Sequence, residues 1–218
     1  MNFFGHAWVA GWFSQREPFI LGSMLPDFAN VLGVSPPASR HAELSAGIEL
    51  HHATDRVFHD TEAFGALEHG AREALGNAGL RKGARRALAH IGVEFLIDAE
   101  LGRRSPEWAG YARALDYGSS GACGSELSWR GSDTSASERL ASLCSRLASV
   151  AREPADTRVL ARRLVATLAS RPRLALIPAE VPLVEAWLGE CRPEVQARLP
   201  DLLAQLAREL DAPVSRYG

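Results

Sequence analysis

Several features that would place the chain in a membrane or secreted class are absent. No stretch of about 18 apolar residues occurs, so we expect no membrane-spanning helix. The apolar start, MNFFGHAWVAGWF, has no preceding positive charges and no small-residue cleavage site, so we expect no signal peptide. Cysteine is scarce as well. The three cysteines lie far apart without zinc-ribbon spacing, which favours reduced thiols in a cytoplasmic protein.

The chain also lacks a strong charge of one sign. Its 218 residues carry a formal net charge of -2 and are 46% hydrophobic, as in an ordinary globular domain. Among the 24 basic residues only Lys82 is lysine, which we attribute to codon bias. The slightly negative net charge, and the lack of aromatic residues interleaved with basic ones, argue against nucleic-acid binding.

Apolar residues recur at helical spacing, and the alternation typical of strands is almost absent. The pattern predicts an all-α fold, a single-domain helical bundle over residues 1–218. We expect metal-site helices within 1–104, a Gly/Ser-rich loop over 117–137 and C-terminal helices within 138–211. The expected helices cover residues 43–59, 61–77, 80–102, 137–152, 156–170, 182–189 and 193–210, with Asp60 as a cap and Pro200 at a start or kink.

The segment Gly47–Asp60, GIELHHATDRVFHD, holds three of the seven histidines. His51, Asp55 and His59 follow one another at intervals of four. Neighbours four apart on a helix stand about 6 Å apart along the axis, so their side chains can converge on one ion. Residues eight apart are separated by about 12 Å. One ion can therefore take His51 and Asp55, while His59 lines the same face or serves a second ion.

A second predicted helix repeats this spacing with His90, Glu94 and Asp98 inside an otherwise apolar run. Ionised carboxylates buried there without a partner would each cost several kcal/mol, which a shared divalent cation would offset. A single pair of this kind is more often a surface contact, but two triads in one small helical chain point to a mononuclear or dinuclear metal site. A buried polar network is the alternative.

Five segments resemble the acyl carrier protein phosphodiesterases, a divergent branch of the HD superfamily of metal-dependent phosphohydrolases. They occur in the family's order and span most of the chain: MNFFGHAWVA with His6, GSMLPDF with Asp27, GIELHHATDRVFHD with His51 and Asp55, GVEFLIDAEL with Glu94 and Asp98, and ASRPRL at Ala169 to Leu174. The specific part of the resemblance lies in the first hundred residues.

The resemblance implies an HD-like fold and hydrolysis of the phosphodiester that joins 4′-phosphopantetheine to a serine of the carrier protein. It implies one or two divalent ions, and nitrogen and oxygen ligands suit manganese, iron, magnesium or zinc. The implied metal ligands are His6, Asp27, His51, Asp55 and Asp98. The expected catalytic residues are His59, as a ligand or proton donor, and His90 and Glu94, next to the metal or at a second ion.

The chain departs from the family at several of these positions. The family usually has aspartate at His59 and at Glu94, histidine at Ala99, and two arginines where His52 and Ala53 stand. Losing the arginines would remove a phosphate contact, because a guanidinium matches the geometry of a phosphate. Two other functions therefore stay open: a metal-dependent hydrolase or lyase of a different substrate, and a carrier-binding module without turnover.

A carrier protein is expected to be acidic, so its partner should present a basic surface. The densest basic run, RKGARR, begins the predicted helix of His90. The predicted substrate contacts are His52, Arg81, Arg85 and Arg86. The alternative is that RKGARR is an ordinary exposed helix face in an arginine-rich chain.

Overall fold

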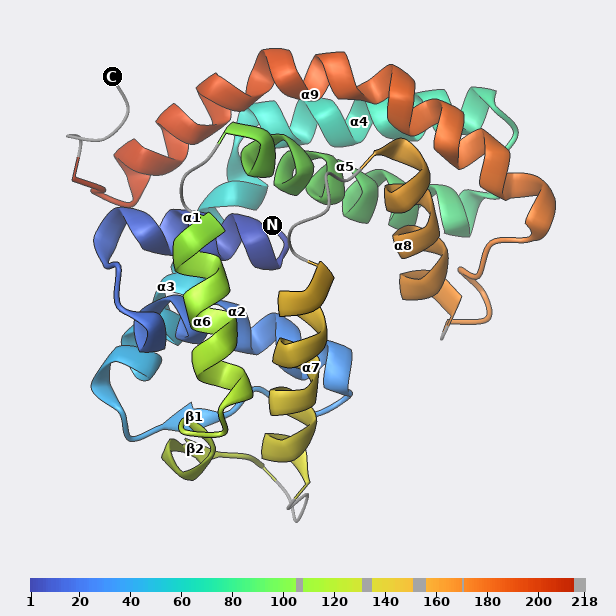
Figure 1. Cartoon of the computed structure of the whole chain (residues 1–218). Coiled ribbons are helices and arrows are strands. Elements are labelled where there is room, and N and C mark those ends of the chain that lie inside the picture. Colours follow the sequence, from blue (N-terminus) through green and yellow to red (C-terminus); the bar gives the residue numbers. More distant parts are fainter. Residues whose placement is uncertain (105–107, 131–134, 151–155, 170, 214–218) are drawn as a thin grey trace. The chain divides into compact units, whose positions relative to one another are not determined.

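The computed structural model describes residues 1–104, 108–130, 135–150, 156–169 and 171–213 (Figure 1). Within these ranges the chain is almost entirely helical, and the predicted all-α class is confirmed. The described helices are α1 (Phe3–Phe13), α2 (Glu17–Leu32), α3 (Ala42–Asp60), α4 (Glu62–Asn77), α5 (Lys82–Arg104), α6 (Trp108–Ser119), α7 (Ala136–Val150), α8 (Thr157–Ala169) and α9 (Val181–Glu209). Two 3-10 turns, Gly124–Glu126 and Pro178–Glu180, and the short strands β1 (Ala38–Ser39) and β2 (Leu127–Ser128) complete them.

The chain groups into two compact units, each discontinuous in sequence. Unit 1 comprises Met1–Val57, Arg104–Glu153 and Ala207–Gly218, and unit 2 comprises Phe58–Arg103 and Pro154–Leu206. Helices α3 and α9 contribute residues to both units. The single domain and the HD-like arrangement stay predictions.

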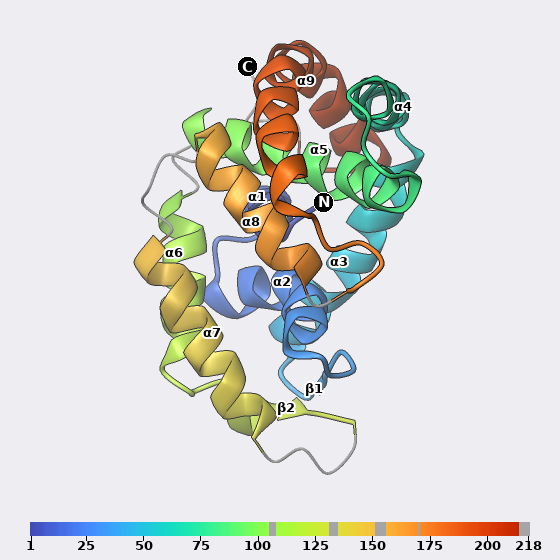
Figure 2. The same cartoon turned by 90° about the vertical axis from the view of Figure 1, so that its right-hand side faces the viewer.

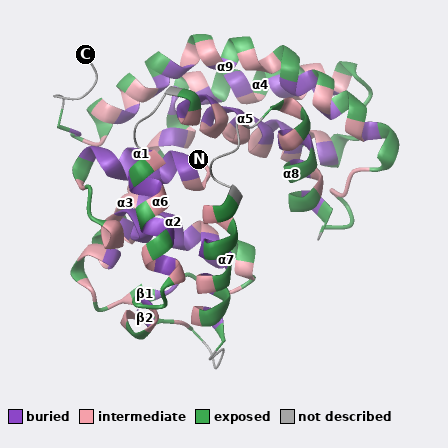
Figure 3. Ribbon diagram, viewed as in Figure 1, coloured by how far each residue is buried: buried purple, intermediate pink, exposed green. Residues whose placement is uncertain are grey.

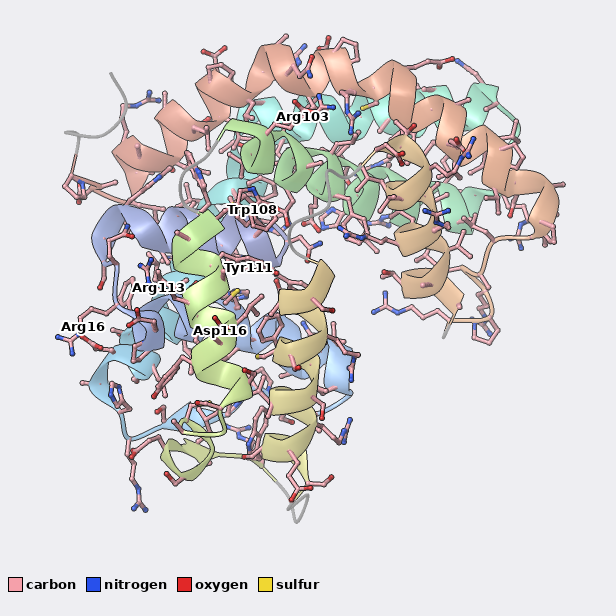
Figure 4. The ribbon with its side chains drawn as sticks, in the orientation of Figure 1. Arg16, Arg103, Trp108, Tyr111, Arg113 and Asp116 are labelled. Carbon is pink, nitrogen blue, oxygen red and sulfur yellow. The ribbon has the colours of Figure 1, made fainter. Side chains whose placement is uncertain are left out.

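Unit 1 is built on α1 and α2, which are buried over most of their length (Figure 3). The ring of Phe4 on α1 stacks on Trp108 of α6 with ring centroids 4.3 Å apart. Along α6, Arg113 extends away from Trp108 and Tyr111 (Figure 4) and forms an ion pair with Glu17 at the start of α2, at 3.0 Å. These two contacts join α6 to both α1 and α2 in unit 1.

Helices α6 and α7 run side by side in opposite directions in both views (Figures 1 and 2). Gly118 allows this approach, because a Cβ there would lie 2.7 Å from the Cys144 sulfur. Below them, β1 and β2 pair antiparallel, with Ala38 opposite Ser128. The strands tie the loop before α3 to the segment after α6.

The crossing of α2 and α3 is the tightest in unit 1. Each helix has a glycine at the crossing, and a Cβ on Gly47 would lie 2.8 Å from Gly22 Cα. The same Cβ would also meet the carbonyl oxygen of Phe19. The backbones of α2 and α3 are therefore in direct contact. This contact brings Ser23, next to Gly22, close to His51, one turn after Gly47.

In unit 2, α5 packs against α8 and α9. Gly92 on α5 accommodates the ring of Trp187, since a Cβ there would lie 2.6 Å from the indole and 3.6 Å from Leu164. Farther along α5, Glu100 is only 2% exposed. Its Oε1 lies 3.1 Å from Arg192 Nε, and its Oε2 accepts a hydrogen bond from Gln196 at 2.9 Å.

The Arg192→Leu variant is expected to lower the free energy of unfolding by about 3 kcal/mol, because it leaves the buried Glu100 carboxylate without its closest cation. The matched control is Arg198→Leu, six residues later on α9, whose exposed pair with Glu194 is expected to contribute less than about 0.5 kcal/mol. Urea denaturation followed by circular dichroism measures both. Equal midpoints for the two variants would show that Glu100 does not depend on Arg192.

Four predictions about the elements need correction. The ranges 182–189 and 193–210 form one helix, α9, which continues through Pro193 and Pro200. An interior proline costs about 3 kcal/mol, and burial of a long apolar face offsets it: Val184, Trp187, Leu188, Val195, Leu199, Leu202 and Leu206. Asp60 is the last residue of α3, and Thr61 caps α4 instead, accepting a hydrogen bond from the Phe64 N–H at 3.2 Å.

The fourth correction concerns the predicted loop over 117–137. Helix α6 extends to Ser119, a 3-10 turn and β2 occupy 124–128, and α7 begins at Ala136. Residues 131–134 of that loop, and 151–152 and 170 of the predicted helices, lie outside the described residues. Among the described helices, none is long and apolar enough to cross a membrane.

Candidate metal centre

Three side chains from three helices of unit 1 meet at one point. His6 comes from α1, Asp27 from α2 and His51 from α3, and one ligand atom of each lies within 4.8 Å of the others. All three were predicted as ligands, although they are far apart in the sequence. The close crossing at Gly22 and Gly47 is what sets α2 and α3 at this separation.

Asp55 adds a second carboxylate to this group. His6 Nε2 lies 3.7 Å from Asp55 Oδ1 and 3.9 Å from Asp27 Oδ2. The amino group of Met1 lies 3.4 Å from the same Asp55 oxygen. The His6 ring thus faces two carboxylates, as the predicted ligand set requires.

The His51 ring is held in one orientation by the backbone of α2. Its Nδ1 lies 2.9 Å from the carbonyl oxygen of Ser23, so Nδ1 carries a proton and donates it. Burial, followed by the neighbouring charge of His6, lowers the pKa of His51 to about 3. The imidazole is therefore neutral at pH 7 with Nε2 as a lone-pair donor, which is the form that binds metals.

Burial divides the group into a closed wall and an open edge. His6 and His51 are 1% and 5% exposed, and their rings stack with centroids 4.0 Å apart. The side chains of Asp27 and Asp55 are 23% and 40% exposed. Two buried imidazoles with two partly exposed carboxylates can neutralise a divalent cation while leaving part of its surface open to solvent.

The predicted catalytic residues form a separate group in unit 2. His59, His90 and Glu94 also place one ligand atom each within 4.8 Å of one another. Their catalytic roles stay predictions. Asp98 lies one turn after Glu94 on α5, in unit 2, and its membership of the unit 1 ligand set likewise stays a prediction.

The predicted substrate contacts occupy different surroundings. His52 is exposed on α3 in unit 1. In unit 2, Arg81 donates hydrogen bonds of 2.9 Å to both oxygens of Glu180 and one of 2.7 Å to the Ala175 carbonyl. The guanidinium of Arg85 lies against Gly76, and Arg86 lines an open cavity. Arg81 thus has a structural contact of its own, and Arg86 is the arginine of this run that faces open space.

Two contacts at these groups were not predicted from the sequence. The Ser23 carbonyl that orients His51 belongs to the backbone, so no residue type could have signalled it. Glu68 on α4, which contacts His90, had a weak signal: it follows Phe64 by four residues and so shares the face of the apolar stripe. Comparisons of the chain with protein-family models, with curated proteins and with solved structures found no match.

Proposed function

We propose that the chain is an HD-like, metal-dependent phosphodiesterase that hydrolyses the phosphopantetheine–serine phosphodiester of an acyl carrier protein or a related phosphodiester. The observation that carries the proposal is the meeting of His6, Asp27 and His51 from three helices. These are positions at which the resemblance to the family implies metal ligands. The resemblance supplies the reaction, and the geometry supports the metal.

The donor atoms fit a divalent cation. Imidazole nitrogen and carboxylate oxygen without thiolate suit manganese, iron, magnesium or zinc. His51 is neutral and oriented by the Ser23 carbonyl, which is the outer contact that metal-binding histidines usually make. Asp27 and Asp55 supply the negative charge that balances the cation.

A bound divalent ion would polarise a phosphoryl oxygen and lower the pKa of a water molecule. The residues of the chain direct the substrate to it. Because His6 and His51 form the buried wall, a phosphodiester reaches the site from the partly exposed side of Asp27 and Asp55.

The expected partner is an acidic carrier protein in the cytoplasm. Arg86 lines an open cavity, and His52 and Arg81 are exposed in their units. Docking of a carrier protein on them is part of the proposal.

The test is the mass of a holo carrier protein after incubation with the purified protein and manganese, iron, magnesium or zinc. We expect the carrier to lose phosphopantetheine when metal is present and to keep it when a chelator is added. A carrier of unchanged mass in the presence of bound metal would sink this function and favour a hydrolase or lyase of another substrate. Failure to bind any of these metals would leave the carrier-binding module.

A further inference from the structure

A second group of possible metal ligands lies in unit 2. His59 lies in the last turn of α3, and His90 and Glu94 lie one turn apart on α5. The metal of the proposed function is assigned to His6, Asp27 and His51, and the catalytic roles of this second group stay predictions. What they bind is therefore a separate question.

The spacing of their atoms is that of ligands around an ion. Oε1 of Glu94 lies 3.4 Å from Nε2 of His59 and 3.4 Å from Nε2 of His90. A charge-assisted hydrogen bond is shorter, about 2.7–2.9 Å. Two ligands of a tetrahedral zinc ion, each bonded at about 2.0–2.2 Å, stand about 3.3–3.5 Å apart. Both distances to Glu94 Oε1 fall in the second range.

Glu68 on α4 fixes which nitrogen of His90 is available. His90 Nδ1 lies 3.3 Å from Glu68 Oε1, and the other oxygen of Glu68 pairs with Arg72. A carboxylate oxygen accepts hydrogen bonds, so Nδ1 is the nitrogen placed to donate to Glu68, and Nε2 is the nitrogen that faces Glu94. A carboxylate on the far nitrogen is the usual outer contact of a zinc-binding histidine.

The two rings are also held parallel. The planes of His59 and His90 differ by 9°, with centroids 5.0 Å apart, and the edge or face of Phe64 contacts both rings. Both Nε2 atoms lie near the same carboxylate oxygen, as ligand atoms do around a single cation.

The group is accessible from solution. The side chains of His59 and His90 are 32% and 38% exposed, against 13% for Glu94. His90 also lines an open cavity of about 400 Å³, whose walls include Arg86 and Arg171. Three protein ligands leave a fourth position of a tetrahedral ion for water or a small anion.

We propose that unit 2 holds a second divalent-metal site in which His59, His90 and Glu94 bind the ion and Glu68 orients His90. Zinc is the ion that suits this donor set and spacing best. The two proposals have different ligands, and the zinc titration below is made without His51, so either can be disproved without the other.

The first experiment titrates zinc into metal-stripped protein by calorimetry, in a His51→Ala background that disables the unit 1 group. We expect one equivalent to bind. Adding His59→Ala and His90→Ala together should abolish it, whereas adding His69→Ala should not, because His69 is 74% exposed on α4 and pairs only with its neighbour Glu73 among the contacts described. Equal zinc binding with and without the His59 and His90 substitutions would overturn the proposal.

The second experiment tests the orienting role of Glu68 with a variant that keeps the size of the side chain. Glu68→Gln is expected to weaken zinc binding about 10- to 100-fold. The matched control, Glu73→Gln on the same helix, should leave the zinc Kd unchanged because Glu73 is 69% exposed and contacts His69 instead. Equal Kd values for the two variants would contradict this role. Failure of phosphodiesterase activity alone would leave both zinc results standing.

Discussion

Replacing His51 by alanine is expected to lower phosphodiesterase turnover by about 1000-fold, equivalent to about 4 kcal/mol of transition-state stabilisation. The reason is that His51 supplies the ligand atom whose orientation is set most firmly, through the 2.9 Å hydrogen bond to the Ser23 carbonyl. Without it, the only imidazole left beside Asp27 and Asp55 is that of His6, and we expect the divalent ion to be lost. We expect elemental analysis of the purified variant to show the loss of one metal equivalent.

Alanine at this position also leaves a cavity and a buried carbonyl without its donor, which together cost about 1–3 kcal/mol of stability. Asp27→Asn separates this structural effect from metal loss, because it keeps the side-chain shape at a partly exposed position. It should lose metal and turnover while melting close to the wild-type temperature. His69→Ala is the control for a histidine on the surface. Full turnover in either His51→Ala or Asp27→Asn would show that catalysis does not depend on this group.

The sequence predicted the candidate site better than it predicted how the site is assembled. Spacing on one helix associated His51 with Asp55, because residues four apart on a helix share a face, and in the structure Asp55 Oδ1 lies 3.7 Å from His6 Nε2. Spacing also separated His59 from His51, and the structure groups His59 with His90 and Glu94. Helical periodicity says nothing of which helices cross, so only the resemblance associated His6 and Asp27 with His51.

The errors in the predicted elements have a similar origin. Pro193 and Pro200 are local signals for a helix end, yet α9 passes through both because its buried face depends on tertiary packing that local propensity does not contain. The Gly/Ser-rich composition hid the end of α6, where Gly118 serves the close approach to Cys144. Glycine marks loops and tight helix contacts alike, and a single sequence does not distinguish the two uses.

Gly47→Ala is expected to lower the free energy of unfolding by about 3 kcal/mol, which corresponds to a fall in Tm of about 6–12 °C. The added Cβ would lie 2.8 Å from Gly22 Cα and would meet the Phe19 carbonyl oxygen. Both obstacles are backbone atoms of α2, so no side-chain rotation relieves the clash and α2 must move away from α3. Differential scanning calorimetry measures the effect.

The control uses the same substitution where space is open. Gly65 lies on the exposed side of α4 with no atom within 4 Å of its added Cβ, and Gly65→Ala is expected to raise stability by about 0.5–1 kcal/mol. If Gly47→Ala lowers the stability and Gly65→Ala raises it, the destabilisation at Gly47 comes from the crossing of α2 and α3. Because the crossing sets the distance between His51 Nδ1 and the Ser23 carbonyl, Gly47→Ala should also weaken metal binding at a temperature where it is still folded. If Gly47→Ala melts at the wild-type temperature, the added Cβ does not clash with α2, and α2 and α3 lie farther apart than the structure places them. The orientation of His51 would then need another cause.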